Sequence, residues 1–259
     1  MRIVFWSPMH GSGASAGATA CAVALAASGQ KILLTQTQYT MNNLEIPFLP
    51  PDTGPVMLEE RGMDRLIRSY KAGHLSTSSI REESIMISEN LWILPGGRQR
   101  AREIYDDRHT REIENRVLEL AHETVGNTIV ELNPGYSQRT MKQIAASDIL
   151  VICVSQDNRM LTELMRDGQI PKGKKKTVFL LGMYDRKSRY VAHYYTSRYA
   201  LLRGQKLFKM PYLSDFRDAI NSCGVYDFLS EGLECDWAGD EKYFFTNVRQ
   251  FADEIGESL

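Results

Sequence analysis

The sequence predicts an α/β fold with one doubly wound, mostly parallel sheet and helices on both of its faces. Short apolar runs alternate along the chain with amphipathic or alanine-rich segments, which is the order of repeated strand–helix units. One run, residues 149–154 (ILVICV), is apolar at every position, as a central strand is when helices cover both faces of its sheet. No linker, repeat or low-complexity segment interrupts this order. We therefore expect a single domain over residues 1–259.

The composition is that of an ordinary globular protein. The formal net charge is −1, so no charge excess directs the chain to nucleic acid or to a membrane surface. Apolar stretches fall short of the roughly 20 residues of a membrane span, and Ser7, Pro8 and His10 interrupt the first one too early for a signal peptide. We expect a soluble, cytoplasmic protein without membrane insertion. Its cysteines lack metal-type spacing and are expected to be reduced: Cys21, Cys153, Cys223 and Cys235.

The first strand–helix unit contains a candidate phosphate-binding loop. Residues 3–6 are an apolar strand, and residues 7–17 are rich in glycine and serine. Residues 18–27 predict an alanine-rich helix that ends at Gly29, before a second strand at residues 32–34. In such a unit, backbone N–H groups converge in the loop and the helix N-terminus adds partial positive charge. The candidate contacts are Gly11, Ser12, Gly13, Ala14 and Ser15.

Residues 7–15 (SPMHGSGAS) resemble the phosphate loop of the ParA/MinD family of deviant Walker P-loop ATPases, S-G-K-G-G-V-G-K-T. Gly11, Gly13 and Ser15 match this pattern. The resemblance implies ATP as the ligand and Ser15 as the Mg²⁺-binding hydroxyl. The two lysines of the pattern are replaced by Met9 and Ala14. Because each charge-assisted hydrogen bond to phosphate contributes about 1.5–3 kcal/mol, losing both predicts much weaker nucleotide binding. The alternative is a glycine loop that only turns the chain.

Other positions that handle the nucleotide in the family also differ. Gln36 and Gln38 stand where the family has two aspartates, and an amide is neither an anionic ligand nor a general base. Glu131 stands at the Walker B aspartate, and we predict that it contacts a metal together with Ser15; a polar strand end is the alternative. Gly182 stands at the asparagine that reads adenine in the family. Each change removes chemistry, which favours a protein that does not hydrolyse ATP.

The remaining elements follow from apolar periodicity. Strands are expected at residues 91–94, 127–132, 149–154, 177–181 and 206–209. Helices are expected at residues 63–71, 98–122, 140–147, 159–167 and 241–255, with a further helix and turn between residues 216 and 224. Residues 40–60 are proline-rich and predict a loop, whereas residues 80–87 are ambiguous. A short helical region before a strand that ends in L-P-G-G (residues 94–97) resembles MinD-like and TadZ/CpaE-like proteins.

Three segments that are expected at the surface could indicate binding to DNA, to another protein or to a membrane. Residues 98–111 carry arginines interleaved with acids, which is typical of i,i+4 pairs on a solvated face; a patch for DNA phosphates is the alternative. These arginines are Arg98, Arg100, Arg102, Arg108 and Arg111. Tyrosines and cations share residues 186–202, either packed along one helix face or forming a partner surface. The last helix is acidic, so anionic lipid would repel it, and we expect it on the core or in a dimer interface.

We therefore expect a bacterial ParA/MinD-like protein of the TadZ-like type with a degenerate nucleotide site. The resemblance implies a homodimer that acts as a non-hydrolysing spatial organiser or scaffold, through a protein partner in a membrane-associated pilus, secretion or conjugation apparatus. One alternative is an active ATP-dependent partition or localisation ATPase whose lysine comes from Lys31 or a partner subunit. The other is a nonspecific DNA-binding partition protein that uses the arginines of residues 98–111.

Overall fold

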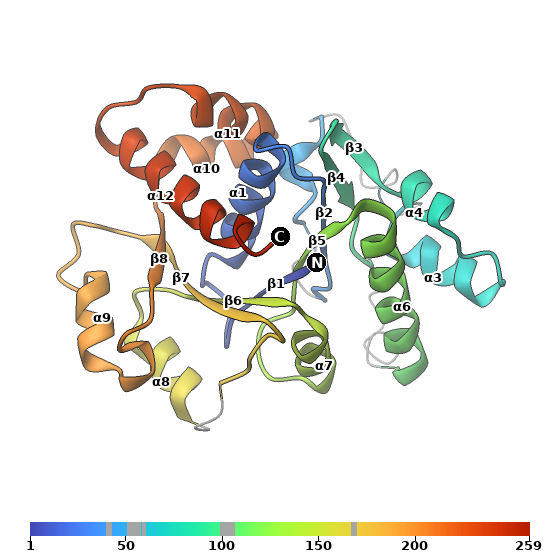
Figure 1. Ribbon diagram of the computed structural model, residues 1–259, viewed down its shortest axis with the longest axis horizontal. Coiled ribbons are helices and arrows are strands. Elements are labelled where there is room, and N and C mark those ends of the chain that lie inside the picture. The colour runs from blue at the N-terminus through green and yellow to red at the C-terminus, as the bar shows by residue number, and fades with distance from the viewer. Residues whose placement is uncertain (40–42, 51–57, 59–60, 99–106, 167–169) are drawn as a thin grey trace.

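The computed structural model describes residues 1–39, 43–50, 58, 61–98, 107–166 and 170–259. Among them, an eight-stranded sheet with the order β3-β4-β2-β5-β1-β6-β7-β8 crosses the middle of the molecule (Figure 1). Its neighbouring strands are parallel except for the antiparallel pair β3 and β4. The predicted fold class, α/β with a mostly parallel sheet, is confirmed. The strands are β1 (Arg2–Trp6), β2 (Ile32–Gln36), β3 (Ile85–Ser88), β4 (Leu91–Leu94), β5 (Asn127–Glu131), β6 (Ile149–Val154), β7 (Lys176–Tyr184) and β8 (Leu207–Pro211).

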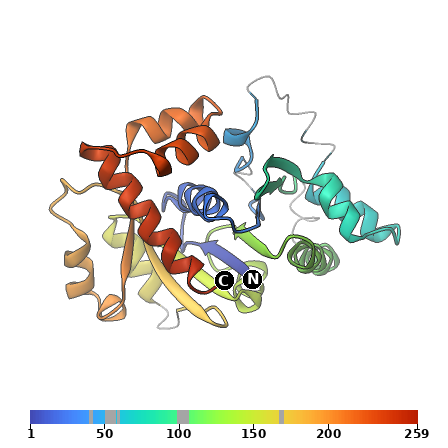
Figure 2. The ribbon, with the colours of Figure 1, turned by 45° about the horizontal axis from the view of Figure 1, so that its top comes forward.

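Helices cover both faces of the sheet, as two views of the ribbon show (Figures 1 and 2). One face carries α1 (Ala14–Ala27), α10 (Ser214–Asn221), α11 (Val225–Glu234) and α12 (Gly239–Gly256). The other face carries α3 (Met63–Lys71), α4 (Thr77–Glu83), α6 (Arg108–Val125), α7 (Gln138–Ala146), α8 (Asn158–Arg166) and α9 (Ala192–Arg198). Short 3-10 helices are η1 (Ile46–Phe48) and η2 (Ala200–Leu202). Among the described residues, no helix combines the length and the apolar composition needed to span a membrane.

The central strands are buried on both sides because their side chains alternate between two cores. In β1, Ile3 and Phe5 belong to the core under α1 and α12, whereas Val4 and Trp6 belong to the core under α6 and α7. All of β6 is buried in the same way. A strand that feeds two cores has to be apolar at every position, which is why its sequence shows no polar alternation.

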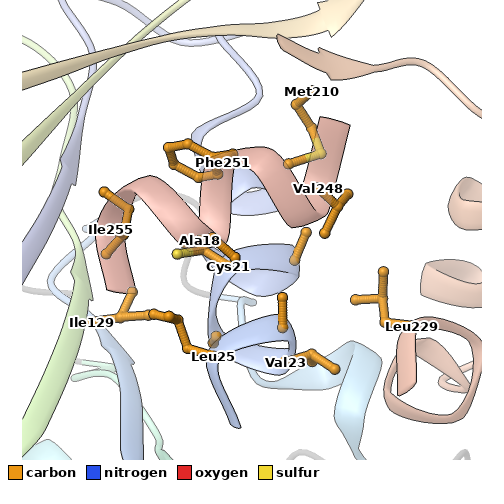
Figure 3. Close-up of a cluster of buried hydrophobic side chains, with 14 of the residues drawn as sticks. Ala18, Cys21, Val23, Leu25, Ile129, Met210, Leu229, Val248, Phe251 and Ile255 are labelled. Carbon is orange, nitrogen blue, oxygen red and sulfur yellow. The ribbon is translucent and has the colours of Figure 1, made fainter. Parts of the chain in front are cut away.

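Helix α1 lies between the sheet and α12, and small residues make this close approach feasible. Figure 3 shows Cys21 and Leu25 of α1 meeting Phe251 and Ile255 of α12 in one cluster. A Cβ atom at Gly17 would come within 2.5 Å of Leu180 Cδ2, so a larger residue there would require the Leu180 side chain or the helix to shift. The alanine-rich composition therefore reflects burial all around the helix.

Several element boundaries differ from the sequence-based prediction. Helix α1 begins at Ala14 and not at residue 18, because Ser15 and Gly17 take part in its first turn and in its packing. Residues 80–87, which were ambiguous, end α4 and form the antiparallel edge strand β3. Helix α11 was not predicted, and β7 continues three residues beyond its predicted end.

The predicted helix over residues 98–122 is wrong at its start. Asp107 has an extended backbone and caps α6, because its side chain accepts a hydrogen bond from the Thr110 N–H, so α6 begins at Arg108. Residues 99–106 lie outside the described part of the chain. The same holds for residues 40–42, 51–57 and 59–60 of the predicted proline-rich loop, within which the structure describes η1.

The sequence predicts that the C-terminal helix lies on the core or in a dimer interface. The structure shows it on the core. Phe251 of α12 is fully buried and meets the Phe5 ring edge-to-face, with ring centroids 6.0 Å apart. Among the tyrosines of residues 186–202, Tyr195 and Tyr199 are buried in the second core, which confirms the packing prediction for these two. Burial raises the pKa of the Cys21 thiol, in accord with a reduced apolar cysteine.

We predict that Phe251→Ala lowers the free energy of unfolding by about 3–5 kcal/mol, because it leaves a cavity between α12 and the central strands. Urea unfolding followed by circular dichroism measures this change. Tyr70→Ala is the matched control, since Tyr70 is 41% exposed and its truncation should cost less than about 1 kcal/mol. Equal losses in the two variants would contradict the packing described for α12.

Candidate functional site

The candidate loop lies at the switch point of the sheet. β1 pairs with β5 on one side and with β6 on the other, and its carboxyl end leads through residues 7–13 into α1. In doubly wound sheets, ligands bind outside the carboxyl ends of the strands at the point where the strand order reverses. The fold therefore places the loop where a ligand is expected.

Glycines and local hydrogen bonds fix the path of the loop. Gly11 and Gly13 have φ angles of +83° and +77°, which side-chain-bearing residues rarely adopt. The Ser7 hydroxyl donates to the Met9 carbonyl at 2.8 Å, and the Gly135 N–H donates to the Ser7 carbonyl at 3.0 Å. This backbone keeps the concave shape that holds anions in other proteins.

Glu131 at the end of β5 contacts the loop directly. The Ser15 hydroxyl donates to Glu131 Oε1 at 2.6 Å, and the Gln38 amide donates to the same oxygen. Glu131 is 2% exposed, and its Oε2 has no hydrogen-bond partner among the described residues. The two residues that the sequence pairs as metal contacts, Ser15 and Glu131, are therefore adjacent, and metal binding by them stays a prediction.

Among the described residues, no lysine or arginine forms an ion pair with the buried carboxylate of Glu131. Burial raises its pKa from 4.5 to about 7, although the hydrogen bonds from Ser15 and Gln38 oppose this rise. The glutamine at position 38 thus supplies a neutral donor at the point where an aspartate of the family would add a second negative charge. At neutral pH the carboxyl group holds its proton for part of the time.

Gln36 has a similar contact with a carboxylate that sequence reasoning missed. Its amide donates to Glu45 Oε2 at 2.6 Å, and Arg98 Nη2 pairs with Glu45 Oε1 at 2.7 Å. Glu45 is buried, which raises its pKa despite the Arg98 contact. It follows β2 in a segment without apolar periodicity, so no sequence pattern pointed to it. Arg98 is therefore occupied inside the molecule.

Gly182 is in direct backbone contact with the loop. A Cβ atom at Gly182 would lie 2.0 Å from the Ser12 carbonyl oxygen, and one at Gly13 would lie 3.1 Å from Gly182 Cα. The end of β7 and the loop therefore touch through two glycines. No side chain, such as the asparagine that the family pattern carries, fits at position 182 without displacing the loop.

The described residues at the loop lack the cations that hold the phosphates of a nucleotide. The cavity at the loop has a volume of about 190 Å³, below the roughly 300–1,000 Å³ of pockets that enclose drug-sized ligands. None of the described residues that line it is a lysine or arginine. Among the described residues, no group of three or more His, Cys, Asp or Glu side chains is arranged to hold a metal ion. The loop has the shape of an anion cradle without the cations that neutralise phosphates.

The predicted arginine patch is largely paired with acids in the part of the chain that the structure describes. Arg108 Nε lies 2.9 Å from Glu112 Oε1, the i,i+4 geometry that the interleaved charges predict. Arg98 pairs with Glu45, and Arg111 Nη1 donates to Gln138 Oε1 at 3.4 Å. Arg100 and Arg102 lie outside the described residues. The paired arginines offer less free charge to DNA than the sequence suggests.

Comparison with solved structures identifies the same fold in MinD and ParA ATPases. The septum site-determining protein MinD from Pyrococcus horikoshii, complexed with Mg-ADP, is 16% identical, and the match covers 99% of this chain and 96% of that one with a TM-score of 0.71. A ParA family ATPase from Chlorobium tepidum is 14% identical over 98% of both chains, with a TM-score of 0.73. A chain of the MinC:MinD cell division protein complex from Aquifex aeolicus is 15% identical, with a TM-score of 0.63 over 99% of this chain and 96% of that one. No protein-family model and no curated sequence matches the chain.

At these identities the similarity establishes the fold alone. The chain has the P-loop NTPase-like fold of the MinD and ParA ATPases along nearly its whole length. Several residues align with positions that handle the nucleotide in the ParA/MinD family. Of these, Ser15, Gln38 and Glu131 are in contact, and Gly182 lies against the loop. Gly11, Ser12 and Gly13 end the loop, Ala14 and Ser15 begin α1, and the role of all five as ligand contacts stays a prediction.

We predict that Glu131→Gln stabilises the protein at pH 8. The native pKa of about 7 exceeds the ordinary 4.5, so the wild type loses stability as pH rises between these values, by about 3 kcal/mol in total. The glutamine carbonyl still accepts from Ser15 and Gln38 but carries no charge. Urea unfolding should show the variant about 3 kcal/mol more stable at pH 8, with a small difference at pH 5. Glu89→Gln, at an exposed site, is the control; a destabilised Glu131→Gln at pH 8 would contradict the burial argument.

Proposed function

We propose that this chain is a single-domain, bacterial ParA/MinD-like protein of the TadZ/CpaE-like type that no longer hydrolyses ATP. It acts in the cytoplasm as a spatial organiser or scaffold for a pilus, secretion or conjugation apparatus. In this role it forms a homodimer and recruits a protein partner of a membrane-associated machine. The fold gives a stable platform, and the altered loop leaves recruitment as the activity that selection maintains.

One observation supports the proposal above all others: the buried carboxylate of Glu131 is held by two uncharged donors, Ser15 and Gln38. Phosphoryl transfer depends on positioned positive charge and on a group that orients the attacking water. Ala14 stands where the family pattern has the phosphate-loop lysine, and Gln38 stands where it has an aspartate. Both changes act against catalysis in the same place.

The similar solved structures support a role in recruiting a protein partner, and they do not identify that partner. One of the similar structures is described as a MinC:MinD cell division protein complex, so that MinD binds another protein. By analogy, this chain recruits a protein through the same scaffold. An active partition ATPase is the competing function, and nucleotide binding separates the two.

We predict that the wild-type chain binds Mg·ATP more weakly than about 1 mM and hydrolyses it at the background rate. Ala14→Lys restores one charge-assisted contact, which should tighten binding by about tenfold to a hundredfold. Isothermal titration calorimetry with and without Mg²⁺ measures both proteins. Turnover should stay at background in the variant because Gln38 is unchanged.

Ala27→Lys is the matched control for this experiment. It adds the same charge to an exposed position of the last turn of α1, away from the loop, and should leave ATP binding unchanged. Micromolar ATP binding by the wild type would contradict the proposal and favour the active ATPase. So would wild-type turnover above that of Ala14→Lys.

The DNA-binding alternative has its own test. Because Arg98 and Arg108 are paired with carboxylates, we predict no gel shift on nonspecific duplex DNA at low salt. A shift that weakens steeply as salt increases would show phosphate contacts and would favour a partition protein.

A further inference from the structure

A cleft separate from the loop cavity opens at the carboxyl ends of β7 and β8, which lie side by side near one edge of the sheet (Figure 1). Its volume is about 520 Å³. Its walls come from three segments: the residues after β7, those after β8, and the first turn of α12. Three elements from distant parts of the sequence thus converge on one hollow surface.

Two large apolar side chains are exposed in this cleft. The pairing of β7 with β8 shifts register between Leu181 and Tyr184, and in that gap Met183 turns outward with a φ of +50° and 53% exposure. Tyr212, directly after β8, is 47% exposed. Exposed apolar surface gathered at a hollow, with polar groups around it, marks an interaction site more often than scattered exposure does.

The charge of the cleft is negative. Four acids and two bases line it: Asp185, Asp215, Asp240, Glu241, Arg186 and Lys187. Only Arg186 and Asp240 form an ion pair with each other, at 2.5 Å. Asp215 and Glu241 make no ion pair among the described residues. A ligand with phosphates would meet this excess of carboxylates, whereas a cationic ligand would be attracted to it.

The cleft already contains one example of the contact that a cation would make. The guanidinium of Arg186 lies over the Tyr243 ring, 4.9 Å from its centroid, and its charge is met by Asp240. Tyr212, Asp215 and Glu241 line the same cleft and provide a second aromatic ring with two carboxylates. The Arg217 guanidinium lowers the pKa of the Tyr212 hydroxyl, so one cation of this chain already lies near that end of the ring.

We propose that this cleft binds an arginine-containing basic segment of a protein partner. The arginine stacks on Tyr212 and pairs with Asp215 and Glu241, and an apolar neighbour on the same segment covers Met183. Arginine suits this role because its planar guanidinium stacks on aromatic rings and bonds to carboxylates at the same time. The inference rests on the proposed function, since it names the surface that a recruiting scaffold uses.

The surrounding loop is held in place before any partner arrives. Gln156 accepts from the Asp185 N–H at 2.7 Å and donates to the Asp185 and Tyr190 carbonyls at 3.1 and 2.9 Å. A side chain from the neighbouring strand end thus fixes both ends of the segment after β7. A fixed surface reduces the ordering cost of binding.

The test uses the full chain and two labelled peptides, N-acetylated and C-amidated, that alternate leucine with arginine or leucine with glutamate. Fluorescence anisotropy should show the arginine peptide binding at least tenfold more tightly than the glutamate peptide, with weaker binding as salt increases. Amide chemical shifts should change for Met183, Tyr212 and Glu241. Asp215→Asn/Glu241→Gln should weaken arginine-peptide binding at least tenfold.

Glu82→Gln/Glu89→Gln is the matched control. It removes the same two charges from exposed positions in α4 and in the turn between β3 and β4, at the opposite edge of the sheet, and should change affinity less than twofold. Tyr212→Phe should keep binding and Tyr212→Ala should lose it. Thermal unfolding of each variant confirms that it folds.

Three results would overturn the inference. The first is equal binding of the two peptides, and the second is equal loss of affinity in the two double variants. The third is self-association of the wild type that Asp215→Asn/Glu241→Gln abolishes, because the occupant is then a second copy of this chain. The proposed function is tested by a different experiment. Micromolar ATP binding would overturn the inactive-ATPase proposal and would leave the result with the peptides unchanged.

Discussion

The burial of α1 between the central strands and α12 is the constraint on which the site depends. A helix with this little space around it has to be built from small residues, and Gly17 lies against Leu180 at the closest point. Because α1 cannot shift, its first turn holds Ser15 next to Glu131 and the preceding loop next to Gly182. The shape of the glycine loop is therefore maintained by packing in the core.

Charge, unlike shape, is not protected by packing. Replacing a lysine in the loop by Ala14 leaves the backbone and the core intact, since the lysine of a phosphate loop contacts the ligand and not the protein interior. The glutamines at positions 36 and 38 each donate to a carboxylate, Glu45 and Glu131 respectively. Neutral amides satisfy buried acids at lower electrostatic cost than a further carboxylate would impose. The fold therefore does not depend on the charged side chains that the family pattern places at these positions.

The two hollow surfaces at the carboxyl edge differ in what they can recognise. The loop cavity is small and has a buried carboxyl group, whereas the cleft beside β7 and β8 is larger, aromatic and negatively charged. Two arginines near this edge are paired internally, Arg98 with Glu45 and Arg186 with Asp240. The carboxylates that line the cleft are the basis on which we propose a cationic protein segment as its ligand.

The sequence by itself determined the fold class, most of the strands and helices in their order, and the position of the glycine loop after the first strand, because apolar period and glycine position depend on local backbone geometry. It also identified the replaced positions Met9, Ala14, Gln36, Gln38 and Gly182, since these are matters of residue type. Only the tertiary structure decided what the new side chains contact: the bonds from Gln36 to Glu45 and from Gln38 to Glu131, and the closure of Gly182 on the loop. The sequence also does not predict the start of α1, the cap of α6 or the cleft after β8. They depend on contacts between segments far apart in the chain, which no local pattern encodes.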